Sequence, residues 1–168
     1  MLTLRLTRPE DIGQISLVLA TSWRTAYRGM VADDYLNTLK DDHWVAFLTA
    51  ELTNDTLFSM VLQDREAIIG ASVIRKSETD GEVHLISLYL LPDRIGQGLG
   101  HIFYCGIEKE MQSRGFSKCT LDVLENNERA IRFYRSHGFL EADSGITAVL
   151  GEHSYPCKVF EKTLPKIG

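Results

Sequence analysis

The sequence LYLLPDRIGQGLG, at positions 88–100, joins an apolar run to three glycines that fall at every second position. The apolar run stops at Pro92, and the next segment, HIFYCGIEKEM at 101–111, has the apolar spacing of a helix. The stretch therefore predicts a strand, a glycine-rich turn and a helix in succession. The first N–H groups of a helix are unpaired and carry partial positive charge, and glycines leave them accessible, so this turn is typical of a pyrophosphate-binding site.

Two common phosphate-binding motifs do not fit this stretch. No Gly-Lys-Ser/Thr follows the glycines, which excludes a Walker loop. The dinucleotide-binding fingerprint needs a βαβ unit with an acidic residue about 20 residues farther on, and neither is present. Taken alone, the glycine pattern fits a flexible turn equally well, so its neighbours along the chain decide its interpretation.

The rest of the chain predicts one mixed α/β domain that covers residues 1–168. Apolar alternation, helical spacing and turn residues indicate where each element lies. Residues 144–156 are expected to form a loop or a partly extended segment. The predicted strands are 2–6, 56–63, 67–75, 82–91, 118–124, 139–143 and 158–164, and the predicted helices are 9–27, 33–39, 41–52, 101–114 and 127–137.

Composition and charge narrow the class of protein. The chain is 44% hydrophobic and 24% charged, as in ordinary globular domains, and its net charge of −5 disfavours a nucleic-acid partner and favours a cationic substrate. No apolar run approaches the roughly 20 residues that a membrane span requires, so no membrane partner is expected. The first residues lack the features of a signal peptide, and we expect a cytoplasmic protein. The oligomeric state stays open between a monomer and a homodimer.

The three cysteines predict neither a disulfide framework nor a metal site. Cys105, Cys119 and Cys157 form no C-x-x-C pair, and their number is odd. We therefore expect all three thiols to be reduced. Cys105 and Cys119 are expected to be small core residues.

Three blocks of sequence together resemble the GCN5-related N-acetyltransferase (GNAT) superfamily, and in particular its small bacterial members. They are LYLLP followed by GQGLGH, then LDVLENNERA at 121–130, then IRFYRSHGF at 131–139. The match is close over residues 82–140 and rests on element order elsewhere. The resemblance implies an α/β fold with a central, mostly antiparallel sheet of six to seven strands, splayed between the fourth and fifth strands, with helices on both faces.

The same resemblance implies that acetyl-coenzyme A is the cofactor. The family's pantetheine arm would pair with the strand at Leu88, Tyr89 and Leu90, and an Asn at position Asn127 would reach the pantetheine amides. The family usually has Arg or Gln where this chain has Ile95, so Arg94, one residue earlier, is the side chain expected to reach a phosphate. The pyrophosphate would take backbone N–H groups of Gly96, Gln97, Gly98, Leu99, Gly100 and His101.

Acetylation of an amine requires a group that removes its proton, because an alkyl ammonium has a pKa near 10.4. Glu82 lies 14 residues before Gly96, a spacing that resembles a catalytic glutamate in one branch of the family. Glu82 is therefore the first candidate for the base, and Asp122 is its rival, because another branch places an acid at that position. His84 alternates onto the same strand face as Glu82, where it would help to hold a water near the substrate. A solvated surface role stays open for each of these side chains, as does proton removal by water alone.

Tyr134 is the expected acid. The family uses the tyrosine of the FYRSHGF segment to protonate the departing thiolate, and a phenol with a pKa near 10 stays protonated at neutral pH. A packed core aromatic is the alternative for this residue. The acetyl carbonyl oxygen is expected to meet a backbone N–H near residues 86–88. We expect direct attack by the amine within a ternary complex, without an acyl-enzyme.

The acceptor is expected to lie beside the first long helix. Trp23 and Tyr27 are four residues apart and share a helix face, where they would form an aromatic wall for a cation or, as is commoner, pack in the core. The segment WRTAYRG also resembles small bacterial acetyltransferases, polyamine acetyltransferase-like members among them. The predicted acceptor is a primary amine of a small molecule. The alternatives are a protein N-terminus or lysine, and a non-catalytic module that senses acyl-CoA.

Overall fold

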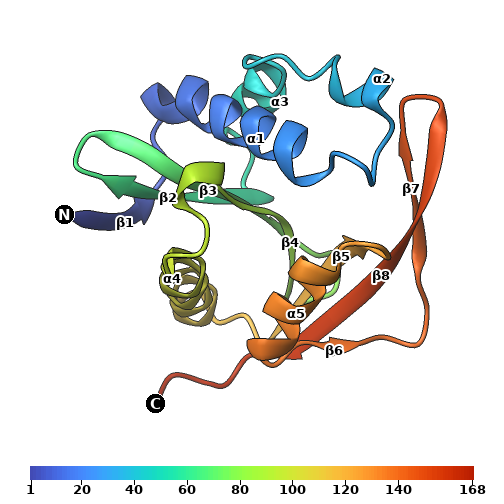
Figure 1. Ribbon diagram of the computed structural model, residues 1–168. Coiled ribbons are helices and arrows are strands. Elements are labelled where there is room, and N and C mark those ends of the chain that lie inside the picture. The colour runs from blue at the N-terminus through green and yellow to red at the C-terminus, as the bar shows by residue number, and fades with distance from the viewer.

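A single eight-stranded sheet organises the computed structural model, which describes residues 1–168 (Figure 1). The strand order is β1-β2-β3-β4-β5-β8-β6, with β7 paired to β8. Every neighbouring pair is antiparallel except β4 and β5, which are parallel. The strands are β1 (Leu2–Leu6), β2 (Leu57–Asp64), β3 (Ala67–Lys76), β4 (Glu82–Leu90), β5 (Lys118–Leu124), β6 (Leu140–Glu141), β7 (Ile146–Leu150) and β8 (His153–Thr163).

Helices cover both faces of this sheet (Figure 1). On one face, α1 and α3 pack on β2 and β3, and on the other face α4 and α5 pack on β4 and β5. No helix is long and apolar enough to cross a membrane. The helices are α1 (Ile12–Ala26), α2 (Asp33–Leu36), α3 (Val45–Glu51), α4 (Leu99–Ser113) and α5 (Glu128–Ser136), with short 3-10 turns at Pro9–Asp11 and Pro92–Arg94.

The central strands supply both cores because successive side chains point to opposite faces. In β2, Phe58 and Met60 join the core beneath α4, whereas Leu57 and Val61 join the core beneath α1. Strands that are buried on both faces are apolar at nearly every position, which is why β2 and β3 read as continuous apolar runs. The expected fold class, a mixed α/β domain with a mostly antiparallel sheet, is confirmed.

The strands β4 and β5 separate soon after they meet. They pair only at Glu82–Lys118, Val83–Cys119 and His84–Thr120, and β4 then continues to Leu90 without a partner on that side. The pairing of β4 with β3 is irregular at the same point, because Ile86 is skipped between Leu85 and Ser87. A bulge of this kind bends a strand and increases its twist. The expected splay between the fourth and fifth strands is therefore present.

The segment expected to be a loop or partly extended, residues 144–156, contains a hairpin. Residues Ile146–Leu150 form β7, and β8 begins at His153 rather than at 158, so the sheet has eight strands instead of six to seven. Gly151 makes the turn with φ of +64°. The hairpin was hard to predict because most β7 side chains are exposed, and an exposed strand lacks a regular apolar alternation.

The expectation that Cys105 is a core residue is wrong, whereas Cys119 is fully buried as expected. The buried face of α4 consists of Leu99, Phe103, Tyr104, Ile107 and Met111. Cys105 lies beside this face and stays partly exposed. The structure contains no disulfide, and all three thiols are free.

A buried ion pair connects β1 to the start of α1. The Arg5 guanidinium donates two hydrogen bonds to Asp11, of 2.7 and 3.0 Å, and the Arg8 backbone N–H donates a third of 2.7 Å. Asp11 is only 5% exposed. The hydrogen bond from Arg5 holds the pKa of Asp11 below its ordinary value, although burial acts in the opposite direction. The ionised carboxylate is thus favoured by folding.

Replacement of this carboxylate should remove stability that depends on pH. We expect Asp11→Asn to lower the free energy of unfolding by about 2 kcal/mol at pH 7, because Arg5 loses its charged partner in a buried site. The folded-state pKa of Asp11 lies below its unfolded value, so its contribution is complete above about pH 5 and is lost as the pH falls through the folded pKa. Urea unfolding at pH 7 and pH 3 should therefore show a smaller acid-induced loss for the variant than for the wild type.

The matched control is Asp80→Asn. Asp80 is exposed in the turn before Gly81, and an Asn-Gly pair suits that turn as well as Asp-Gly. This variant should behave like the wild type at both pH values. Equal acid-induced losses in the wild type and Asp11→Asn would contradict the assignment.

Candidate active site

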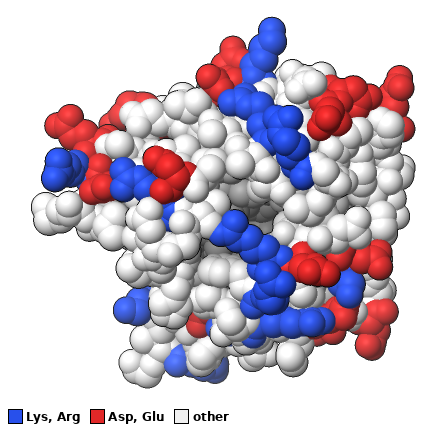
Figure 2. All heavy atoms as spheres, in the orientation of Figure 1, with Lys and Arg blue, Asp and Glu red and all other residues white.

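A cavity of about 680 Å³ lies where β4 and β5 diverge. Its walls come from α1, β4, β5, α5 and the turn that precedes α4. Figure 2 shows the hollow near the centre of one face of the molecule, with Lys and Arg side chains on two sides of it. A second pocket, beside Met30 and Tyr155, measures only about 20 Å³. The open gap in the sheet is thus large enough to enclose a sizeable ligand.

The glycine-rich turn forms one end of the cavity. Gly96 and Gly98 both line it and both have positive φ angles, of +83° and +76°. A side chain at either position would meet no protein atom within 4 Å, so the space beside the backbone is free. No backbone N–H of residues 96–101 donates a hydrogen bond within the protein. This arrangement is a cradle for an anion such as a pyrophosphate.

Two side chains near the cradle point away from it. Arg94, expected to reach a phosphate, instead donates to the Asp64 carboxylate at 3.1 Å and does not line the cavity, whereas Ile95 does. The Gln97 amide donates to the Asp93 carbonyl at 3.0 Å. The expected contact of Gln97 with the pyrophosphate involves its backbone N–H and not its side chain, so the direction of the side chain does not affect it. The cradle is therefore built from backbone groups rather than from basic side chains.

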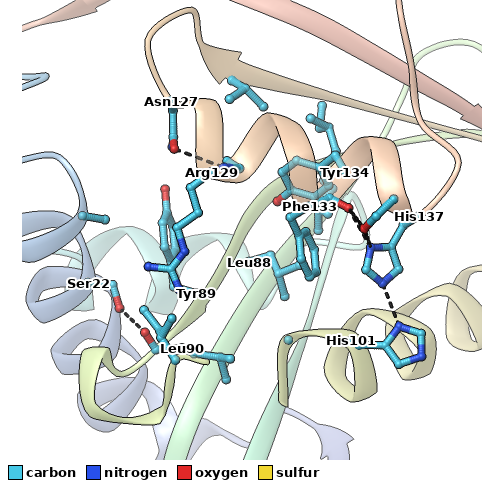
Figure 3. Close-up of a pocket in the computed structure, with 18 of the residues that line it drawn as sticks. Ser22, Leu88, Tyr89, Leu90, His101, Asn127, Arg129, Phe133, Tyr134 and His137 are labelled. Atoms are coloured by element: carbon cyan, nitrogen blue, oxygen red, sulfur yellow. Dashed lines mark hydrogen bonds between the residues drawn. The ribbon is translucent and has the colours of Figure 1, made fainter. Parts of the chain in front are cut away.

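The last residues of β4 line the cavity as expected. Leu88, Tyr89 and Leu90 all face it (Figure 3). The Ser22 hydroxyl donates to the Leu90 carbonyl at 3.0 Å, which attaches α1 to the end of β4. The hydroxyls of Tyr89 and Tyr27 are 2.8 Å apart, and burial raises the pKa of both phenols.

The helix α5 supplies the opposite wall. The Asn127 side-chain oxygen accepts a hydrogen bond from the Ala130 N–H at 3.2 Å and so caps the helix. Its amide N–H groups stay available to a ligand in the cavity. Tyr134 lies farther along the same helix and also lines the cavity (Figure 3).

The Tyr134 hydroxyl has the properties of a proton donor. Burial raises its pKa above the ordinary value, and the neighbouring Tyr27 and Cys119 act in the same direction. The Tyr134 hydroxyl has no hydrogen-bond partner in the protein, yet it is not fully buried. Only the Tyr104 hydroxyl is both fully buried and without a partner. The phenol therefore keeps its proton at neutral pH and can give it to a bound molecule.

The three candidate proton acceptors lie in different surroundings. Asp122 lines the cavity, and its carboxylate lies 3.2 Å from Nε2 of His84. Nδ1 of His84 lies 2.8 Å from the Thr120 hydroxyl oxygen. Glu82 does not line the cavity and lies 3.7 Å from the Lys118 ammonium. The structure therefore brings Asp122 and His84 together and leaves Glu82 apart.

Trp23 and Tyr27, the aromatic pair on α1, lie in different surroundings. The rings of Trp23 and Tyr27 lie 4.5 Å apart. Trp23 packs against Tyr35 and Trp44 in a small core outside the cavity, as the commoner alternative expects. Tyr27 lines the cavity itself. An aromatic surface is thus offered to a ligand by Tyr27 rather than by the pair.

Arg129, an exposed residue in the first turn of α5, lines the cavity although nothing in the sequence pointed to it. Figure 3 shows its side chain extending from the helix over the cavity. The residue stands two positions after Asn127 in a block that the analysis did single out. Its direction could not be read from sequence, because an exposed helical arginine most often points to solvent.

Residues 19–139 match the acetyltransferase (GNAT) family, which is most of the chain. The chain belongs to this family, and it is an acyltransferase of the N-acetyltransferase class.

Known proteins resemble the chain along most of its length. The N-acetyltransferase YuaI of Bacillus subtilis (strain 168), itself uncharacterized, is 29% identical over 145 residues, which cover 82% of this chain and 79% of that protein. The PaiA N-acetyltransferase of Thermoplasma acidophilum, solved with coenzyme A, has a TM-score of 0.78 at 20% identity and covers 97% of this chain and 99% of its own. YncA of Salmonella typhimurium, solved with its cofactor acetyl-CoA, has a TM-score of 0.74 at 17% identity over 100% of this chain and 96% of its own. At these identities the two structures establish the fold.

A side chain in the cradle should interfere with coenzyme A. We expect Gly98→Ala to weaken coenzyme A binding by about tenfold, because the new methyl group occupies the space beside the free N–H groups. The positive φ also costs about 1–2 kcal/mol of stability for a non-glycine residue. Calorimetric titration with coenzyme A measures the first effect, and thermal unfolding measures the second.

Gly115→Ala separates the two effects. Gly115 follows the far end of α4, has φ of +85°, and likewise has no atom within 4 Å of an added side chain. It should lose similar stability and keep wild-type affinity for coenzyme A. Equal affinities of the two variants would show that residues 96–101 do not hold the phosphates.

Proposed function

We propose that this protein transfers the acetyl group of acetyl-CoA to a primary amine of a small molecule, by direct attack within a ternary complex. The observation that carries the proposal is one continuous cavity with a different chemistry at each part of its wall. Free backbone N–H groups at 96–101 lie at one end, and the Tyr134 hydroxyl and the Asp122 carboxylate line the rest. A phosphate-bearing donor and an amine acceptor therefore have separate places in the same space.

The residues present fit coenzyme A. The cradle at 96–101 suits the pyrophosphate, and the edge of β4 that has lost β5 suits the amides of the pantetheine arm. The free amide of Asn127 and the guanidinium of Arg129 add a donor and a positive charge on the α5 side. When bound, acetyl-CoA supplies the acetyl group as an activated thioester.

Tyr134 completes the transfer as a general acid. The Tyr134 phenol would give its proton to the sulfur as the amine displaces it from the acetyl carbon. The second proton that the nitrogen loses in becoming an amide would leave to solvent, from which the phenolate would be reprotonated. A phenol whose pKa is raised by burial is protonated before the reaction and readily reprotonated after it. The bulge at Ile86 lies where β4 leaves β5, and we assign a backbone N–H at this bulge to the acetyl oxygen.

Asp122 is the proposed base, with His84 as its positioning residue. The carboxylate lines the cavity on the side of α1, where it can accept the proton of the ammonium directly or through one water. Nε2 of His84 lies 3.2 Å from this carboxylate and restricts its direction. Glu82 is the less favoured base because it stands beside Lys118 outside the cavity.

A small cationic amine fits the acceptor side of the cavity. Tyr27 offers an aromatic face there and Asp122 a negative charge, and both features attract an ammonium group. The experiment is a thiol-release assay with acetyl-CoA and a panel of polyamines, aminoglycosides, amino acids and peptides. Release with small amines supports the proposal. Release with peptides alone would indicate a protein acetyltransferase, and coenzyme A binding without release by any amine would indicate a sensor.

Loss of the phenolic proton should slow transfer without affecting binding. We expect Tyr134→Phe to reduce kcat by about 10²-fold, the effect of removing a general acid. Its dissociation constant for coenzyme A should stay within about twofold of the wild type. Tyr35→Phe removes a hydroxyl outside the cavity and should retain full activity. Unchanged turnover in Tyr134→Phe would exclude Tyr134 as the acid.

Removal of the base should produce a defect that fades at high pH. Below pH 10.4 the neutral fraction of an alkyl amine rises about tenfold per pH unit, so a variant without a base depends increasingly on amine that is already neutral. We expect Asp122→Asn to lose kcat/KM strongly at pH 7 and much less at pH 10. His84→Gln should show the same trend in weaker form, and Glu82→Gln should follow the wild-type profile. A pH-dependent defect in Glu82→Gln with a normal Asp122→Asn would reverse the assignment.

A further inference from the structure

We propose that His101, Cys105 and His137 form a binding site for Zn²⁺ at the edge of the cavity, which connects α4 to the end of α5. Each offers one ligand atom, and these atoms all lie within 4.8 Å of one another. Two imidazoles and a thiolate are a favoured ligand set for this ion. The proposal does not depend on the acceptor or on the catalytic roles given above.

Two of the three separations between ligand atoms are close to those of a tetrahedral site, and the third, between Sγ of Cys105 and Nε2 of His137, is at most 4.8 Å. Nδ1 of His101 lies 2.9 Å from Nε2 of His137, and Sγ of Cys105 lies 3.7 Å from Nδ1 of His101. Tetrahedral Zn²⁺, with bonds of about 2.0 Å to nitrogen and about 2.3 Å to sulfur, places two nitrogens about 3.3 Å apart and nitrogen and sulfur about 3.6 Å apart. Small side-chain rotations would therefore suffice to admit the ion.

The tautomer of His137 is already the one that a metal requires. Its Nδ1 lies 2.8 Å from the Phe133 carbonyl, which can only accept, so Nδ1 carries the proton. Nε2 consequently presents its lone pair toward His101, as Figure 3 shows by the line that joins the two rings. A backbone carbonyl that holds the second ring nitrogen of a histidine is the usual support of a metal ligand.

The surrounding packing fixes the ligands in place. The His137 ring lies 4.4 Å from the Phe133 ring and 4.7 Å from the Tyr104 ring, which restricts its rotation. His101 and Cys105 are four residues apart on α4, so both side chains leave the same face of that helix. The site thus combines an i,i+4 pair on one helix with a third ligand held by another.

Three protein ligands leave a fourth position for water or a ligand in the cavity. His101 and His137 both line the cavity, and His101 is exposed, so the ion can enter from solvent. Binding would release the Cys105 proton, since the thiolate is the ligand.

The alternative to a metal site is a simple hydrogen bond between the imidazoles of His101 and His137, with His101 as the donor.

Cobalt is the probe that distinguishes these alternatives. We expect Co²⁺ added to the untagged protein to produce a thiolate-to-cobalt charge-transfer band together with the d–d bands of a tetrahedral site, both removed by Zn²⁺. Zn²⁺ should also raise Tm, because it binds only the folded chain. Absence of the charge-transfer band in the wild type would overturn the proposal.

The variants identify the ligands. Cys105→Ser and His137→Gln should each abolish the charge-transfer band or weaken Zn²⁺ affinity by at least about 100-fold, more than the loss of an outer-shell partner causes. Cys157→Ser alters a buried thiol outside the cluster and should leave both the spectrum and the affinity unchanged. If Cys105→Ser retains the band, or if Cys157→Ser loses it, the metal lies elsewhere and the proposal fails.

Discussion

The early divergence of β4 from β5 is the constraint on which the rest of the structure depends. A strand that loses its partner exposes N–H and C=O groups that must be hydrogen-bonded by something else. Here each strand keeps its other neighbour: β3 follows β4 to Leu90, and β8 follows β5 to Leu124. Both edges therefore stay rigid while the gap between them stays open to a ligand.

The cavity's chemistry follows from which element closes each side of this gap. The turn before α4 contributes free N–H groups at the positive end of a helix, whereas β5 contributes the Asp122 carboxylate near α1. Between them lie apolar side chains and the half-buried phenols of Tyr89 on β4 and Tyr134 on α5. A molecule with phosphates at one end and a reactive acyl group at the other thus has one favourable orientation in the cavity.

The helices α4 and α5 must lie close together for this cavity to exist. Gly100 permits the approach, since a side chain there would lie 3.2 Å from the Phe133 ring. His101 and His137 face each other across the same junction. An ion held at this junction would stiffen the two helices that bound the donor side of the cavity.

The sequence predicted correctly those features that neighbouring residues determine together. The glycines at 96, 98 and 100 predicted the backbone cradle, and the block around Tyr134 predicted the helix that faces it. Reasoning failed where an outcome depends on a distant partner. Arg94 lies beside the cradle in the sequence but pairs with Asp64, 30 residues away along the chain. No residue near Arg94 in the sequence indicates this pairing. The exposed strand β7 gave too little apolar alternation to be recognised.

The sequence by itself determined the class of fold and the glycine-rich turn, because apolar periodicity and backbone conformation are encoded by neighbouring residues, and its resemblance to known proteins indicated the family. Only the tertiary structure decided which polar side chains meet. It placed Asp122 beside His84 and left Glu82 with Lys118. It also moved Cys105 out of the core and brought His101 within 2.9 Å of His137, from a distance of 36 residues along the chain. Contacts between residues that are distant in the sequence depend on how helices and strands pack, and packing is a property of the whole chain.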